Sequence, residues 1–262
     1  MKLGRTWAAG LICMALLAAV IALAPPGFAE DSEEGSFRID EVNPTTQPSA
    51  SKPADSAGPG EEPKLVAIEA RDAEYHQSIK DVLRAMRLSP KDLTAWLLRH
   101  PESILHKLGS FSADDQRKVA TVTRYIRGTN PSVAPMTALR TAGALVYYSA
   151  KYGIPVHLST AVAHTESRFD PKAVSNKGAM GIMQVMWRVH NGLLQANGIA
   201  TKDDMFNPEK GVAAGCLLLS RYINAYGSIP KALARYYGGS STAYFRKVNT
   251  KMANIRSSIY PQ

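Results

Sequence analysis

The sequence predicts a mainly α-helical fold, and two observations lead to this prediction. Apolar residues in the body of the chain recur at three- and four-residue steps, as at Leu139, Ala142 and Val146, which is the spacing of one helix face. No run of alternating apolar and polar residues in this body has the pattern of a β-strand. At 262 residues the chain has room for one sizeable domain with extra segments, or for two small domains.

Residues 1–29 have the three parts of a secretory signal peptide. Lys2 and Arg5 precede an apolar run of roughly 18 residues, and small residues end at Gly27-Phe28-Ala29. We expect export and cleavage after this last residue, which predicts a periplasmic protein. An uncleaved N-terminal anchor is the alternative, because the apolar run approaches the length of a membrane-spanning helix.

Residues 30–63 are predicted to be a disordered acidic linker, rich in Pro and Ser. They carry nine Asp/Glu and two Lys/Arg, and they have too few large apolar side chains to offset the entropy of ordering. Residues 64–262 carry 27 basic and 13 acidic residues, a net charge of +14. Such a positive body favours an anionic partner such as nucleic acid, a membrane surface or a cell-wall polymer; charge that only maintains solubility is the alternative.

Residues 64–130 are predicted to be a helical extension that packs on the main domain or precedes it. Their apolar residues mostly recur at three- and four-residue steps, interrupted at Ser89-Pro90 and His100-Pro101. Ser112 with Asp115 has the pattern of a helix start. These apolar stripes predict core, and nothing in them is typical of a catalytic site.

Residues 131–262 are predicted to form the main domain, whose helices end at Pro and Gly. Asp170-Pro171 is expected to end the helix that begins near Val156, because a residue before proline is pushed out of the α region. Residues 187–205 contain several Gly and Asn and are expected to be irregular. The expected helices cover 136–152, 156–170, the segment from Asn207-Pro208 to Gly227, 229–236, and a last amphipathic segment with Tyr244, Phe245, Val248 and Ile255.

The sequence predicts no metal site and no cofactor. Its two cysteines are Cys13 and Cys216, and because Cys13 lies in the signal peptide, the mature chain would hold one thiol and no internal disulfide. His100 and His106 are not arranged as metal ligands.

Glu166 is the residue that the sequence singles out for acid–base chemistry. It lies on the same helical stripe as Leu158 and Val162, directly before a polar loop punctuated by glycines. Burying an ionised carboxylate costs several kcal/mol, so this side chain is expected to be paired, protonated or functional. A buried structural pair with Arg168 or Lys172 is the alternative to catalysis.

The other carboxylates of this region have structural explanations. Asp170 stands at a helix end before proline, and Asp203-Asp204 precede a loop where they are expected to be solvated. Glu209 stands in the first turn of a helix, where a negative charge is favoured by the helix dipole.

Several short motifs follow one another around and beyond Glu166. They are His164-Thr165-Glu166-Ser167-Arg168-Phe169-Asp170-Pro171, Ser175, Gly178-Ala179, Gly181-Ile182-Met183-Gln184, Phe206-Asn207-Pro208, Gly215 and Ala232-Leu233-Ala234-Arg235-Tyr236-Tyr237-Gly238-Gly239. In this order they resemble the Glu-Ser, Gly-Leu-Met-Gln and Ala-Tyr-Asn-Ala-Gly motifs of the soluble lytic transglycosylases, over about 138–245. The resemblance implies a lysozyme-like helical fold and cleavage of the MurNAc-β-1,4-GlcNAc bonds of peptidoglycan glycan strands.

The resemblance implies a mechanism with one carboxyl group, where ordinary glycosidases use two. Glu166 would protonate the leaving oxygen while the N-acetyl group of the substrate assists at the anomeric carbon. The ionised Glu166 would then remove the 6-hydroxyl proton, which gives a 1,6-anhydro product. Apolar surroundings would keep the carboxyl group protonated at rest by raising its pKa to roughly 6. A hydrolase would need a placed water and usually a second acid, for which the sequence offers no clear candidate.

The resemblance also implies substrate-binding residues in the loop after Glu166. Ser175 and Gln184 match family residues that line the sugar site, and each can bond a hydroxyl or acetamido group; ordinary hydrogen bonding within the loop is the alternative. Met186 matches a methionine that lines the binding groove.

Two tyrosines complete the implied site. Tyr236 matches a tyrosine near the acid, where its hydroxyl can orient Glu166 or the acetamido group, and a packed ring is the alternative. Tyr237 stands where the family has an asparagine. Its ring can stack on a sugar, but it lacks the amide, and this departure puts substrate positioning in question.

Two functions follow from these observations. The first is an exported peptidoglycan lytic transglycosylase, which the intact motifs around Glu166 favour. The second is a catalytically impaired peptidoglycan-binding or scaffolding protein of a cell-envelope secretion or conjugation machine, which Tyr237 and the extra helical region favour. A nucleic-acid partner is not expected, because the chain has a signal peptide and no recognised nucleic-acid motif.

Overall fold

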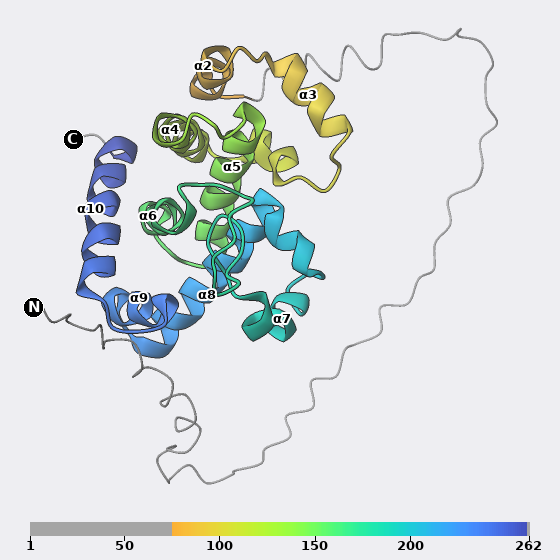
Figure 1. The fold of residues 1–262 in the computed structure, drawn as a ribbon. Helices are drawn as coiled ribbons and strands as arrows, with labels where there is room; N and C mark the ends of the chain where they lie inside the picture. Colours follow the sequence, from red (N-terminus) through yellow and green to blue (C-terminus); the bar gives the residue numbers. More distant parts are fainter. Residues whose placement is uncertain (1–74, 261–262) are drawn as a thin grey trace, which may run out of the picture. The chain divides into compact units, whose positions relative to one another are not determined.

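The computed structural model describes residues 75–260, and this part of the protein is built from helices without a β-strand (Figure 1). This confirms the prediction of a mainly α fold. The predicted signal peptide, the predicted linker and residues 64–74 lie outside the described residues. The elements are α2 (Gln77–Ala85), α3 (Pro90–Leu98), the 3₁₀ helix η1 (Ile104–Ser110), α4 (Ala113–Thr129), α5 (Pro135–Lys151), α6 (Val156–Ser167), α7 (Trp187–Gln195), the 3₁₀ helix η2 (Lys202–Phe206), α8 (Pro208–Tyr226), α9 (Ile229–Tyr237) and α10 (Thr242–Ile259).

Side-chain caps fix where several helices begin. The Ser112 hydroxyl accepts a hydrogen bond from the Asp115 amide at 3.0 Å, as the pattern of a helix start predicts. The Asn207 side chain likewise accepts from the Glu209 amide at 2.9 Å and opens α8. Gly227 ends α8 with a φ of 68°, a left-handed conformation that glycine adopts without strain.

The helices before and after residue 130 share one hydrophobic core. α5 packs against α4 on one side and α8 on the other, and α10 runs along α6 and α4 (Figure 1). Core residues from the extension, such as Ile79 and Ile126, are as fully buried as Leu145 and Leu158 of the main domain. The predicted division at residue 130 coincides with the loop between α4 and α5, and the packing continues across it.

A buried carboxylate ties the extension to the main domain. Glu209, at the start of α8, is 5% exposed and accepts hydrogen bonds from the Ser103 hydroxyl at 2.6 Å and the Ile104 amide at 3.0 Å. Arg140 of α5 donates to the same carboxylate at 2.9 Å. Because a buried charge needs partners, this network explains Glu209 better than the helix dipole alone.

The expectation that residues 187–205 are irregular was wrong, because α7 and η2 lie there. α7 places the fully buried Leu194 on its inner side while Val189 is exposed. η2 begins with a capping box between Thr201 and Asp204. The burial of single apolar side chains outweighs the low helix propensity of the Gly and Asn residues here.

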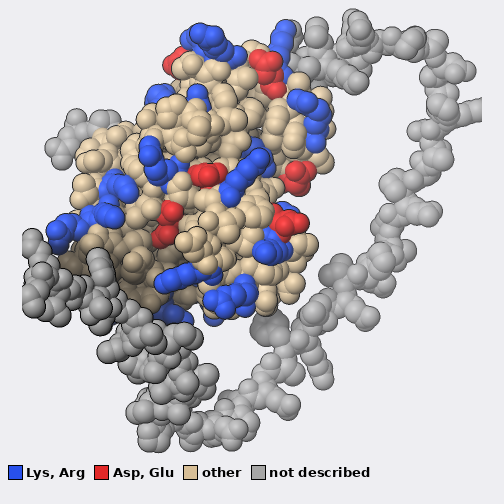
Figure 2. All heavy atoms as spheres, in the orientation of Figure 1, with Lys and Arg blue, Asp and Glu red and all other residues tan. Residues whose placement is uncertain are grey.

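The described part of the protein has no helix with both the length and the hydropathy of a membrane span. Figure 2 shows Lys and Arg side chains spread over the face in view, with fewer Asp and Glu between them.

Candidate active site

Glu166 lies in the last turn of α6, and its side chain is partly buried. The hydroxyl group of Tyr244, from α10, donates a hydrogen bond of 2.6 Å to Glu166 Oε1. Within residues 75–260 Glu166 forms no ion pair, and the Arg168 guanidinium donates to the Thr129 carbonyl at 2.9 Å instead. The alternative of a structural pair with Arg168 or Lys172 is therefore not formed.

The electrostatic surroundings favour a protonated Glu166. Burial raises the pKa of this carboxyl group, and the hydrogen bond from Tyr244 and the charge of Lys251 oppose that rise only in part. The Lys251 ammonium group donates to the Thr165 hydroxyl at 3.2 Å, one residue from the acid. Burial, together with the negative charge of Glu166, also raises the pKa of Tyr244, so its hydroxyl group stays a hydrogen-bond donor.

The end of α6 differs from the expectation that the helix continues to Asp170. The helix stops at Ser167 because Arg168 and Phe169 both adopt left-handed backbone conformations, with φ of 54° and 66°. This turn brings the Phe169 ring into the core, where it is fully buried. The ring packs edge-on to Tyr125 of α4 at 6.1 Å between centroids. Burial of a large aromatic ring offsets the cost of two non-glycine residues at positive φ.

Helix α4 of the extension supports the end of α6. The Tyr125 hydroxyl and His164 Nδ1 lie within hydrogen-bond distance at 2.7 Å. Asn130 donates to the Arg168 carbonyl at 3.0 Å. Burial, with the nearby cations Lys251 and Arg168, lowers the pKa of His164 to about 4, so the imidazole is neutral near pH 7 and carries no charge toward the acid.

The loop between α6 and α7 is hydrogen-bonded to Ser167, the residue that follows Glu166. The Ser167 hydroxyl donates to the Ile182 carbonyl at 2.7 Å. Gly181 has a φ of 70°, and a Cβ atom there would lie 2.1 Å from the Met205 carbonyl oxygen. Only glycine fits this position, which explains the glycine of the motif.

Ser175 and Gln184 form hydrogen bonds within this loop. The Ser175 hydroxyl accepts from the Ala179 amide at 3.0 Å. The Gln184 side-chain amide donates to the carbonyls of Ala173 and Gly181 at 3.1 and 3.0 Å. Both residues therefore shape the loop, and their role toward a substrate stays a prediction.

The two motif tyrosines lie close to the acid but differ in their contacts. The Tyr236 hydroxyl donates to the Met183 carbonyl at 2.7 Å, and the charge of Glu166 helps to raise its pKa after burial. The Tyr237 ring is 55% exposed and stacks on Tyr244 at 4.6 Å between centroids. Glu166, Tyr244 and Tyr237 thus form a continuous row, and the direct bond to the acid comes from Tyr244 rather than Tyr236.

Met186 stands at the cap of α7 and is partly buried. Among the described residues it forms no hydrogen bond with Glu166, so its role as a groove-lining residue stays a prediction.

Tyr244 and Lys251 do not stand out in the sequence. Tyr244 belongs to the last amphipathic segment, and in the structure it is buried. A buried tyrosine hydroxyl usually needs a hydrogen-bond partner, and this is the one signal that could have pointed to a polar neighbour.

Known proteins resemble the chain over the segment that contains this site. Residues 144–259 match the family model of the transglycosylase SLT domain. A transglycosylase of Enterobacteria phage PRD1 is 33% identical over 95 residues, which cover 36% of this chain and 33% of the phage protein. The membrane-bound lytic murein transglycosylase C of Yersinia pestis (strain Pestoides F) and that of Yersinia pseudotuberculosis serotype O:1b (strain IP 31758) are each 32% identical over 127 residues, which cover 43% of this chain and 36% of theirs. The chain thus spans about a third of the length of these curated relatives. No solved structure matches the chain.

Proposed function

We propose, from the premise that residues 144–259 belong to the transglycosylase SLT domain family, that the protein is a lytic transglycosylase of peptidoglycan. Glu166 is its acid and base. The observation that supports this most directly is a partly buried carboxyl group with no ion pair among the described residues, held by a tyrosine donor and with a raised pKa. A carboxyl group in this state can give up a proton to a substrate and then take one back.

The chemistry that we propose uses this one carboxyl group twice. Protonated Glu166 donates its proton to the glycosidic oxygen as the bond to the anomeric carbon breaks, and the acetamido oxygen of the same sugar assists at that carbon. Ionised Glu166 then accepts the proton of the 6-hydroxyl group, whose oxygen closes on the anomeric carbon. The products are a shortened strand and a 1,6-anhydro sugar, and no water is consumed. The hydrogen bond from Tyr244 stabilises the ionised carboxylate between the two steps.

A single carboxyl group favours this chemistry over hydrolysis. The influences on the pKa of Glu166 within the described residues are burial, Tyr244 and Lys251, and no second carboxylate is among them. Hydrolysing glycosidases pair two carboxyl groups at about 5–9.5 Å from each other. No carboxylate among the described residues acts on the pKa of Glu166, and we take this as support for the non-hydrolytic route.

The sugar contacts that we propose come from the motif residues around the acid. The ring of the exposed Tyr237 gives a sugar a flat surface to stack on, and Tyr236 is hydrogen-bonded to the loop that follows Glu166. Ser175, Gln184 and Met186 hold and line the loop that follows Glu166. We place the protein in the bacterial cell envelope as an exported, periplasmic enzyme, on the basis of the signal peptide pattern of residues 1–29.

The test is digestion of purified sacculi by the mature protein, with muropeptides separated and weighed by mass spectrometry. We expect 1,6-anhydro products from the wild type and none from Glu166→Gln. Asp203→Asn, a change at an exposed carboxylate, is the matched control and should leave the products unchanged. Products with reducing ends only would replace this proposal with a hydrolase.

A second candidate function rests on Tyr237, which stands in place of the family asparagine. In this case the protein binds peptidoglycan as a catalytically impaired scaffold, in a cell-envelope secretion or conjugation machine. Sedimentation with sacculi would then persist without turnover and would not respond to Glu166→Gln. Appearance of anhydro products only in Tyr237→Asn would establish that this tyrosine impairs the site.

A further inference from the structure

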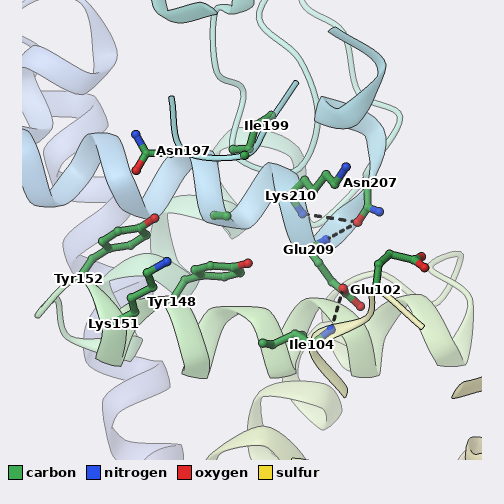
Figure 3. A pocket seen from close by; sticks show the side chains of 12 residues that line it. Glu102, Ile104, Tyr148, Lys151, Tyr152, Asn197, Ile199, Asn207, Glu209 and Lys210 are labelled. Carbon is green, nitrogen blue, oxygen red and sulfur yellow. Dashed lines mark hydrogen bonds between the residues drawn. The ribbon is translucent and has the colours of Figure 1, made fainter. Parts of the chain in front are cut away.

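A closed-in cavity lies between α5, α8 and the segments before η1 and after α7 (Figure 3). Its volume is about 160 Å³. Tyr148 of α5 and Tyr152 at the C-cap of that helix extend into it from one side, and Asn207 and Glu209 approach from the start of α8. Tyr244 and Lys251, the two side chains that act on Glu166, do not line this cavity.

The aromatic wall of the cavity offers flat surfaces and free hydroxyl groups. The rings of Tyr148 and Tyr152 are stacked, with 6.0 Å between centroids and an angle of 17°. Neither hydroxyl group has a hydrogen-bond partner among the described residues. Burial, with Tyr152 and Glu209 nearby, raises the pKa of Tyr148 to about 12, so this hydroxyl group is neutral and can both donate and accept.

The charged groups that line the cavity sum to zero net charge, and two of the four already have hydrogen-bond or ion-pair partners. Two carboxylates, Glu102 and Glu209, face two ammonium groups, Lys151 and Lys210. The Glu209 carboxylate already accepts three hydrogen bonds, and Lys210 is bound to Asp204 at 2.7 Å. No net charge is left to select an ion. An uncharged ligand with several hydroxyl or amide groups and an apolar face fits this mixture.

Lys151 closes the aromatic side of the cavity. Its ammonium group lies 5.4 Å from the Tyr152 ring centroid and 5.8 Å from that of Tyr148. Asn197, on the segment after α7, is exposed on another side; its amide nitrogen donates to the Leu193 carbonyl at 2.8 Å, and its second N–H and its carbonyl oxygen are left for a ligand. Paired aromatic rings with amide, hydroxyl and ammonium groups around them bind the faces and the hydroxyl groups of a sugar ring.

We propose that this cavity is a second saccharide-binding site, which takes one uncharged sugar ring carrying hydroxyl and acetamido groups. The volume is well below the about 300–1,000 Å³ of sites for larger ligands, and this limits the occupant to a single ring. That the ring belongs to a glycan strand rests on the function proposed above.

The site is separate from the acid along the protein. Tyr152 lies before the start of α6 at Val156, and Glu166 lies in the last turn of that helix, about 15 Å along the helix from its first residue. A strand held at this cavity would raise the local concentration of glycan at Glu166 without any new contact to the reacting bond.

The experiment maps binding of N,N′-diacetylchitobiose by amide chemical shifts of isotopically labelled Glu166→Gln protein. We expect shifts at the amides of 148–152 and 197–199, and at least a 10-fold weaker affinity in Tyr152→Ala. Tyr226→Ala, which removes an exposed tyrosine elsewhere on α8, is the control and should bind normally. Tyr152→Phe keeps the ring and guards against misfolding; it should lose part of the affinity while its unfolding temperature stays at the wild-type value.

Other outcomes would overturn the proposal. Shifts confined to residues 171–186 would place the sugar only beside Glu166. Shifts at the cavity with the dipeptide D-alanyl-D-alanine, and none with the disaccharide, would contradict the ligand class. Release of anhydro products with no sugar bound at the cavity overturns this inference alone. Sugar bound at the cavity of a protein that releases no products overturns the proposed activity and leaves the site in place.

Discussion

At the scale of residues, Glu166 is governed by a competition in which burial prevails. The Tyr244 hydroxyl and the Lys251 ammonium group favour the ionised carboxylate, and desolvation favours the protonated form more strongly. The carboxyl group therefore keeps its proton to a higher pH than a glutamic acid in water does. The same hydrogen bond remains available to the carboxylate once the proton has left.

Tyr244→Phe should weaken catalysis and shift its pH dependence. Loss of a hydrogen bond to a charged group costs about 1.5–3 kcal/mol, so turnover should fall about 10- to 100-fold. The lost donor also lowered the pKa of Glu166, so the alkaline limb of the pH–rate profile should move to higher pH. Release of soluble product from sacculi across a pH series measures both effects. An alkaline limb that stays in place would show that the hydrogen bond does not act on the reacting proton.

Glu166→Gln should stabilise the fold at neutral pH. Folding raises the pKa of Glu166 above its ordinary value of 4.5. The stability of the wild type therefore falls as the pH rises through this raised pKa, because the buried carboxyl group ionises. Glutamine avoids that cost and keeps an oxygen for Tyr244. Thermal unfolding should show a higher Tm for the variant at about pH 7 and no difference at about pH 4. If the variant and the wild type had the same Tm at both pH values, this would contradict the raised pKa of Glu166.

At the scale of elements, the loop between α6 and α7 depends more strongly on Gly181 than on Gly178. Gly181 and Gly178 both have positive φ, but a Cβ atom at Gly181 would lie 2.1 Å from the Met205 carbonyl oxygen, and nothing lies within 4 Å at Gly178. Alanine at Gly178 should cost about 1 kcal/mol for the backbone conformation alone. Alanine at Gly181 should cost about 3 kcal/mol, because a backbone clash is added.

Paired thermal unfolding of Gly178→Ala and Gly181→Ala checks this prediction. Differences of this size correspond to a loss in Tm of about 3 °C and about 10 °C for a domain of this length. Equal losses would show that the loop moves away from Met205 at little cost.

The elements that the sequence predicted well are those with local signals. The helix starts at Ser112 and Asn207 depend on side chains that cap the first turn, and the end at Gly227 depends on the left-handed backbone of a glycine. The end of α6 and the existence of α7 depend on where Phe169 and Leu194 are buried, and tertiary packing of this kind is absent from a local pattern. In the site, Glu166 followed from its stripe and motif, whereas Tyr244 lies 78 residues away and only the fold brings it there.

At the scale of the whole molecule, charge should contribute to binding of the proposed peptidoglycan substrate. Residues 64–262 have a net charge of +14, and basic side chains are spread over the face shown in Figure 2. Peptidoglycan with intact peptide stems is anionic, so exposed charges should add attraction that salt screens. The fraction of Glu166→Gln protein that sediments with sacculi should fall several-fold between about 0.05 and 0.5 M NaCl. Sedimentation that is independent of salt would assign binding to uncharged contacts alone.

The buried Glu209 has a consequence for how this protein can evolve. Two of its three donors, Ser103 and Ile104, lie before residue 131, at the start of η1. A recombination event that transferred residues 131–262 alone would leave the buried Glu209 carboxylate without these two donors. Breaking a buried charge network costs about 3–5 kcal/mol. Residues 131–262 therefore cannot be exchanged alone without a loss of stability, and their inheritance is coupled to that of the preceding helices.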